Sequence, residues 1–272
     1  KKKYIFDIFK PVSKTFYKKE NIDKLKLYDV IFILSPDFTH SYYVKKLYKY
    51  CYIFCEKPPC NKKNDLEFLK KIKSKKIYYN FNFRFSKLSE ILKSRKKYNL
   101  GNLRYANIIS GHGLAFKNNY KFNWRSEKKN CPKGILEMVS IHWIDLISYF
   151  FKISKFNKPN LINISSKGSS FDNSHIKLQI NKNTFVDIFT SYTTPLLKRK
   201  ILVFENGIIE QDDNYLMVKG PALNLDKNKF FKEPKIIKKF KINENKDKEQ
   251  SLKKSVEFFL KIGSLYLLKY SM

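Results

Sequence analysis

The chain has 272 residues, of which 43% are hydrophobic, and 56 Lys and Arg outnumber 24 Asp and Glu to give a formal net charge of +32. This size supports one large domain or two ordinary ones, and no apolar run approaches the roughly 18–20 residues of a membrane span. So strong a positive charge normally suggests a nucleic-acid or membrane partner. The lysines are spread along the whole chain, however, and its richness in Ile, Asn, Phe and Tyr points to AT-rich codons as the origin of the lysine excess. We therefore expect neither partner.

The four cysteines do not form a recognisable framework. Cys51, Cys55 and Cys60 crowd into ten residues, and Cys131 stands apart. Such spacing does not resemble a disulfide scaffold, and zinc would need a closing pair such as C-x-x-C, which the sequence lacks. We expect no metal site and a reducing, cytoplasmic environment.

The first 84 residues alternate apolar strands with helices. Strands are expected at 4–9, 29–34, 52–55 and 77–83, and helices near 22–27, 41–49 and 61–75. Strand, helix and strand at this spacing predict right-handed crossovers and a parallel sheet. We assign residues 1–84 to this domain.

After Arg84 the strands follow one another without intervening helices, which predicts a second α+β domain, residues 85–272, with a large and mostly antiparallel open sheet. Strands are expected at 103–110, 161–165, 176–181, 185–192, 201–205 and 215–218, with a hairpin turn at Asn206-Gly207. Helices are expected at 86–97, 135–151 and 251–268, with an irregular stretch at 111–133 and a loose, charged surface segment at 227–249. We expect homo-oligomerisation through this sheet.

Ligands in parallel sheets bind at the carboxyl ends of the strands. Ser35-Pro36 and Glu56-Lys57-Pro58 lie at two such ends. A lysine there can be an ordinary solvated loop residue or an aimed proton carrier. Two prolines, Pro58 and Pro59, restrict the backbone directly after Lys57, and burial of an ammonium lowers its pKa toward neutrality. Both observations favour the aimed lysine.

Five local patterns occur in order along the chain. They are Ser35-Pro36 with Thr39-His40, Glu56-Lys57-Pro58, the run from Asn80 to Phe85 (NFNFRF), Trp124-Arg125, and the run from Gly134 to Asp145 (GILEMVSIHWID). Together these patterns resemble the glucose–fructose oxidoreductase / inositol dehydrogenase family. The motifs resemble the family over about residues 4–150, and the rest of the chain resembles it by architecture alone.

The resemblance implies an NAD- or NADP-dependent oxidoreductase that transfers a hydride between nicotinamide and a hydroxyl-bearing carbon of a sugar, a sugar derivative or a cyclic polyol. Lys57 matches the family lysine that contacts the substrate hydroxyl, and His142 matches the histidine of the helix motif. Cofactor contacts are assigned to Asp7, Ser35, Pro36, His40, Glu56, Lys57, Asn82, Arg84, Trp124 and Arg125. For Trp124 and Arg125, simple closure of their loop is an equal alternative. Asp7 favours NAD, because a carboxylate pairs well with the ribose 2′-hydroxyl and poorly with a 2′-phosphate.

The helix motif leaves two questions open. His142 and Asp145 are three residues apart and share a helix face, so Asp145 either satisfies a core histidine or takes part in catalysis. The family often has an acid four residues before the histidine, where this chain has Met138. Glu137 lies one residue earlier, about 100° around a regular helix. Either a local irregularity lets Glu137 substitute, or the third catalytic group is missing.

The front of the chain also departs from the family. A Rossmann domain needs a glycine-rich turn at the pyrophosphate, and no glycine precedes Gly101. We therefore expect the chain to be a fragment that lacks the first βα unit, roughly 30 residues. The alternative is a non-catalytic relative that binds a ligand or a partner.

Overall fold

The computed structural model describes residues 20–72 and 74–269, and its contacts divide the chain into two compact units. The first unit contains the residues up to Phe81 together with those from Leu252 onward, and the second unit runs from Asn82 to Ser251. Among the helices of the described ranges, none is long and apolar enough to cross a bilayer.

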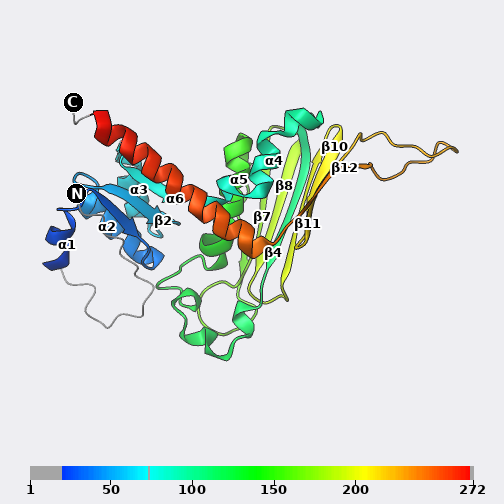
Figure 1. The fold of residues 1–272 in the computed structure, drawn as a ribbon. Helices are drawn as coiled ribbons and strands as arrows, with labels where there is room; N and C mark the ends of the chain where they lie inside the picture. The colour runs from blue at the N-terminus through cyan, green and yellow to red at the C-terminus, as the bar shows by residue number, and fades with distance from the viewer. Residues whose placement is uncertain (1–19, 73, 270–272) are drawn as a thin grey trace. The chain divides into compact units, whose positions relative to one another are not determined.

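The first unit contains a parallel sheet of three strands in the order β1-β2-β3 (Figure 1). The strands are β1 (Val30–Ile33), β2 (Tyr52–Glu56) and β3 (Ile77–Asn80), and the helices are α1 (Glu20–Leu25), α2 (His40–Leu47) and α3 (Lys63–Lys71). Val44 and Leu47 of α2 pack with Ile53 of β2 in a fully buried core. The predicted Rossmann-type architecture is confirmed. The expected strand at 4–9, and with it Asp7, lies outside the described residues.

An aromatic cluster joins the C-terminal helix to this sheet. Helix α6 (Glu244–Lys269) places Phe259, only 3% exposed, 5.5 Å from Phe54 of β2 and 5.8 Å from Phe32 of β1. Burial of such large rings is strongly favourable, so the second half of α6 belongs with the first unit. The sequence-based division, which assigned all residues after 84 to the second domain, differs from the structure in this helix.

The second unit contains a nine-stranded sheet in the order β12-β11-β10-β9-β4-β8-β7-β5, with β6 also pairing with β7. Its strands are β4 (Leu103–Gly111), β5 (Ile153–Phe156), β6 (Asn160–Ile162), β7 (Asn173–Ile180), β8 (Thr184–Ser191), β9 (Leu197–Phe204), β10 (Gly207–Gln211), β11 (Tyr215–Lys219) and β12 (Ile236–Lys241). Strands β4 and β8 are parallel, and the remaining pairs are antiparallel. The predicted large, mostly antiparallel sheet is confirmed.

Two helices cover one face of this sheet, α4 (Lys87–Lys93) and α5 (Ile141–Phe150) (Figure 1). Alternation along β4 turns Ala106 and Ile108 into the core beneath these helices, whereas Asn107 and Ile109 lie on the opposite face and are only partly buried. Short 3-10 turns occupy the region expected to be irregular: η4 (Leu114–Phe116), η5 (Asn118–Phe122) and η6 (Trp124–Ser126).

Two expectations for the second unit are corrected by the structure. The charged segment 227–249 is not loose throughout, because β12 pairs with β11 and α6 begins at Glu244. Backbone hydrogen bonds to a neighbouring strand hold β12 in place whatever its side-chain charges. The helix expected at 135–151 begins instead with a π-helical turn at Leu136–Ser140.

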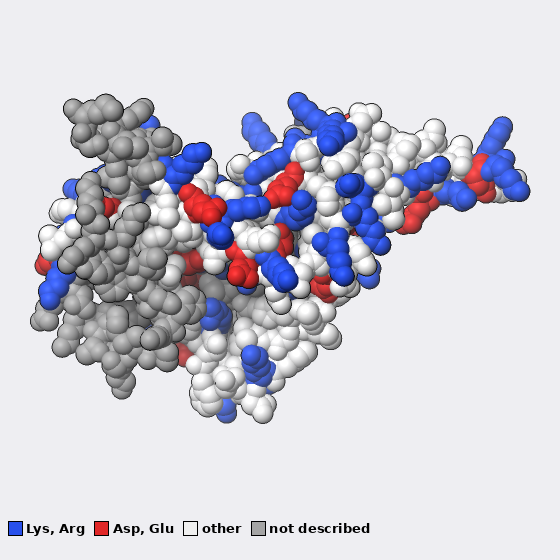
Figure 2. All heavy atoms as spheres, in the orientation of Figure 1, with Lys and Arg blue, Asp and Glu red and all other residues white. Residues whose placement is uncertain are grey.

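Figure 2 shows how charge is distributed on one face of the molecule. Over the second unit, lysines and arginines are scattered and mixed with acidic residues. This distribution agrees with a lysine excess spread along the chain.

Candidate active site

The carboxyl ends of β1 and β2 are held together by His40, the first residue of α2. The ring nitrogens of His40 lie 2.8 Å from the carbonyl oxygen of Ser35 and 2.7 Å from that of Pro58. Burial lowers the pKa of His40, since desolvation disfavours the charged ring. In the structure the His40 ring contacts the backbone of both strand-end loops, and the cofactor contact assigned to His40 from the sequence stays a prediction. Ser35 and Pro36 lie in the first of these loops, where the Ser35 and Thr39 hydroxyls are 2.5 Å apart.

Glu56 and Lys57 lie in the second loop, at the end of β2. The Glu56 carboxylate accepts a 2.6 Å hydrogen bond from the Asn80 amide of β3 and a 3.3 Å bond from the Lys57 backbone N–H. Asn80 in turn accepts from Ser255 of α6 at 2.7 Å. The backbone at Lys57 is therefore anchored to β3 and α6, while the Lys57 side chain is half-buried. The role of the Lys57 side chain as a proton carrier stays a prediction.

The second unit contains the π-turn η7 (Leu136–Ser140) and the helix α5 that continues from it. The Ile141 backbone N–H donates to the Leu136 carbonyl oxygen five residues earlier. In such a turn, residues five apart take the relation that residues four apart have in an α-helix. The turn thus supplies the local irregularity that would let Glu137 replace an acid at Met138.

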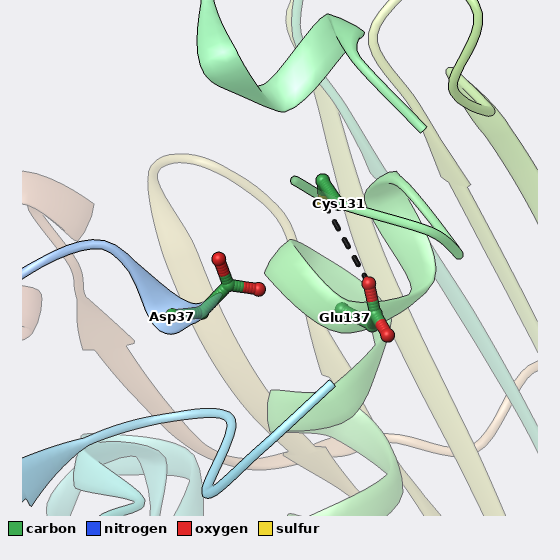
Figure 3. Close-up of side chains that lie close together, drawn as sticks. All are labelled: Asp37, Cys131 and Glu137. Carbon is green, nitrogen blue, oxygen red and sulfur yellow. Dashed lines mark hydrogen bonds between the residues drawn. The ribbon is translucent and has the colours of Figure 1, made fainter. Parts of the chain in front are cut away.

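Glu137 is 7% exposed and is held at the start of this turn (Figure 3). Its Oε2 accepts a 3.1 Å hydrogen bond from the Lys133 backbone N–H and a 3.7 Å contact from the Cys131 thiol. Met138 instead packs in an apolar cluster with Tyr120, Ile135 and Tyr192. The Glu137 side chain therefore lies among polar groups, and the Met138 side chain lies in an apolar cluster.

His142 stacks on Phe83, which belongs to the 3-10 turn η2 (Asn82–Phe85). The two rings are 4.4 Å apart at their centroids and 18° from parallel. Phe83 also packs edge-on against Trp143 at 4.6 Å. A stacked aromatic neighbour restricts the orientation of the imidazole, as a positioned proton carrier requires.

Asp145 pairs with Arg84 and not with His142. Arg84 donates to both carboxylate oxygens, at 2.8 Å from Nε and 2.5 Å from a terminal nitrogen. Burial raises the pKa of Asp145, and the Arg84 guanidinium partly opposes this shift. The two roles considered for Asp145, partner of His142 and catalytic group, both compete with this bidentate ion pair.

The remaining predicted residues have local partners in the second unit. The Asn82 amide donates to the Ser251 hydroxyl at 2.8 Å, which joins η2 to the start of α6. The Arg125 guanidinium lies 4.3 Å from the Trp124 ring centroid. This contact joins neighbouring residues, so both alternatives for the pair, closure of the loop and contact with the cofactor, stay predictions.

Comparison with known proteins gives a likeness in structure. No family model matches the chain, and no curated protein matches it. A levoglucosan dehydrogenase in complex with NADH and levoglucosan is 17% identical, with a TM-score of 0.72 over 89% of this chain and 73% of that one. The chain has the fold of these dehydrogenases. An inositol dehydrogenase homologue from Azotobacter vinelandii, complexed with NAD⁺, is 14% identical, with a TM-score of 0.70 over 92% of this chain and 72% of that one.

A third structure, a dehydrogenase from Clostridium difficile, is 17% identical, with a TM-score of 0.64 over 88% of this chain and 72% of that one. The resemblance to the glucose–fructose oxidoreductase / inositol dehydrogenase family is therefore confirmed at the level of fold. Sequence reasoning missed the role of Phe83 as the ring stacked on His142. The only sequence feature that pointed to Phe83 was its position within the NFNFRF motif.

Proposed function

We propose that the protein is an NAD-dependent oxidoreductase that transfers a hydride between nicotinamide and a hydroxyl-bearing carbon of a sugar, a sugar derivative or a cyclic polyol. The observation that carries this proposal is Lys57, anchored at the carboxyl end of β2 in a fold shared with dehydrogenases. NAD is favoured over NADP, because the similar structures contain NADH or NAD⁺.

The residues of the first unit fit a nicotinamide nucleotide in part. The carboxyl ends of β1, β2 and β3 share one sheet edge, which is where nucleotides bind in doubly wound folds. His40 pins two of the loops at this edge, so Ser35, Pro36 and Lys57 are presented from a fixed backbone. Residues 20–72 and 74–81, which contain the described strands of this unit and the turns between them, include no glycine, so these turns offer no glycine-rich approach to a pyrophosphate. The described residues of this unit therefore fit the nicotinamide half of the cofactor and not its pyrophosphate.

The bound cofactor would supply the carbon that accepts or donates the hydride. Lys57 is proposed to exchange the proton of the reacting hydroxyl, a role for which its anchored backbone and half-buried side chain suit it. His142 is proposed to hold and protonate substrate oxygen from α5, with its ring oriented by Phe83. Glu137, brought into register with His142 by the π-turn, is proposed as the third polar group. Asp145 is proposed to orient η2 through Arg84 and not to touch substrate.

Cofactor binding by the complete protein tests the function. NADH fluorescence and calorimetry, followed by turnover on a panel of polyols, anhydrosugars and nucleotide sugars, should give micromolar binding and NAD⁺ reduction with at least one class. Binding of a sugar without any nicotinamide affinity would support the non-catalytic alternative and reject the enzyme.

We also propose that the protein forms homo-oligomers through the sheet of the second unit. The face opposite α4 and α5 carries exposed apolar residues, including Tyr105 and Phe185. A hairpin arm at 221–235 projects beyond the strands (Figure 1) and exposes Phe230 and Phe231 by 70% and 85%. Exposed apolar surface of this kind commonly marks an interface. Light scattering of Phe185→Ser should show dissociation, whereas Phe122→Ser, a control at a more exposed phenylalanine in η5, should not.

A reducing compartment is proposed from the thiols. All four cysteines are free, and three of them are buried. Burial raises the pKa of the Cys51 thiol to about 11, which keeps it in the unreactive thiol form. We place the protein in the cytoplasm; Cys60, the least buried thiol, should be the first to react with a thiol reagent.

A further inference from the structure

A pair of buried hydroxyls lies under the π-turn of the second unit. The Ser140 hydroxyl on η7 is 2.6 Å from the Thr190 hydroxyl on β8, and both residues are 0% exposed. Ser174 of β7, the register partner of Thr190, adds a third hydroxyl that is 1% exposed. The π-turn packs on both of these strands.

Between Thr184 and Thr190, the core-facing side chains of β7 and β8 are apolar, so the Ser140–Thr190 pair is a polar contact at one end of these strands. Towards the other end of the strands the same face carries Ile176 and Leu178 on β7 and Val186 and Ile188 on β8. Placing hydroxyls in such a core is costly unless they form hydrogen bonds. Because the hydroxyls lie under the π-turn, their hydrogen bond is placed to hold the turn against the sheet.

π-Helical turns are rare and occur mostly as single turns within α-helices. Ser140 ends the turn, two residues before His142, and its hydroxyl bonds to a strand fifty residues further along the chain. Without that bond the segment can relax to α-helical register. Relaxation would rotate Glu137 by about 100° relative to His142 and bring Met138 into its place.

We infer that the Ser140–Thr190 hydroxyl pair is a positioning device that locks the π-turn and so sets the register of Glu137 with His142. Neither hydroxyl is assigned contact with substrate. Thr190 is a positioning residue that acts through Ser140. The inference rests on the proposed function for its catalytic meaning, while its structural statement can be tested without any substrate.

The test compares Thr190→Val with Thr184→Val. Thr184 lies on the same face of the same strand, is 5% exposed, and donates its hydroxyl to the Leu103 carbonyl oxygen at 3.0 Å. Both variants remove one buried hydrogen bond from β8, so both should lower the melting temperature by a similar amount. Thr190→Ser retains the hydroxyl and should restore wild-type behaviour.

The first readout is the ring ¹H–¹³C spectrum of the four histidines. Thr190→Val should shift the His142 signals, whereas Thr184→Val and Thr190→Ser should leave them in place. His40, in the other unit, serves as the internal reference. Unchanged His142 signals in Thr190→Val would overturn the inference. Should that variant fail to fold, Ser140→Ala removes the other hydroxyl of the pair and carries the same expectation.

The second readout is turnover. Thr190→Val should lower kcat by about 10- to 100-fold, with little change in the KM for NAD, because a small misplacement of reacting groups costs this much. Equal kcat losses in Thr190→Val and Thr184→Val would show that the Ser140–Thr190 pair only stabilises the fold, and would reject its positioning role. An inactive wild type would reject the proposed function, yet the histidine spectra would still decide the inference.

Discussion

The imidazole of His142 stacks on the phenyl ring of Phe83, with centroids 4.4 Å apart and planes 18° from parallel. Phe83 belongs to a turn that follows the last strand of the parallel sheet, and His142 lies 59 residues further along the chain, on α5. The stacking links two of the motifs that were recognised separately in the sequence.

Phe83→Ala should release the His142 ring. We expect kcat to fall by up to roughly 10²-fold, since orientation of a reacting group is worth this much, and stability to fall by about 0.5–3 kcal/mol. Phe85→Ala, on the same turn, is the control and should leave kcat near wild type. Steady-state kinetics with urea unfolding measures both effects; equal kcat in the two variants would contradict the proposed orientation.

Lys57→Ala should lower kcat by about 10²–10⁴-fold, the usual contribution of an acid–base group, with NADH affinity nearly unchanged. The exposed neighbour Lys62 provides the charge-matched control. A similar loss of kcat in Lys62→Ala would show that surface charge, and not a proton carrier at position 57, determines the rate. Turnover and NADH fluorescence titration separate the two.

Arg84→Ala should leave the Asp145 carboxylate buried without its guanidinium and destabilise the protein by roughly 1–3 kcal/mol. Burial already raises the pKa of Asp145, so its ionisation costs stability as pH rises above the unfolded value of about 3.9. Loss of Arg84 removes the group that opposes the increase in the Asp145 pKa. The loss of stability in Arg84→Ala should therefore be larger at pH 7.5 than at pH 5. Urea unfolding at both values measures it.

Asp145→Asn in the Arg84→Ala background supplies the check on that prediction. A neutral amide removes the ionisation cost, so the double variant should be more stable at pH 7.5 than Arg84→Ala alone and should lose its extra pH dependence. A double variant no better than the single one would mean that the ion pair is not the source of the deficit.

His40 should titrate below its ordinary value of 6.5, because its burial lowers the pKa. The unfolded chain then binds more protons than the folded one, so stability falls as pH drops below about 6.5 toward the folded-state pKa. His40→Asn should weaken that acid sensitivity, whereas His175→Asn, at a more exposed histidine, should preserve it. NMR titration of His40 with unfolding between pH 5 and 7.5 provides the measurement.

Several features could be predicted because they are encoded over short stretches. The apolar runs at β1 and β2 and the helices between them fixed the parallel sheet, since strand and helix periods depend on neighbouring residues. The prolines after Lys57 marked the strand-end turn for the same reason. Strand β12 escaped prediction because its run of charges resembles a loose segment, while its place depends on pairing with β11.

The sequence by itself determined the alternating architecture, the order of the five motifs and the position of Lys57 at a strand end. Only the tertiary structure decided that Asp145 pairs with Arg84 and that a π-turn at Leu136–Ser140 precedes the helix that carries His142. Both depend on partners distant in the chain: Arg84 lies 61 residues from Asp145, and Thr190 lies 50 residues from Ser140. An i→i+5 turn and an i→i+4 turn differ little in local preference, so contacts with the sheet beneath select between them.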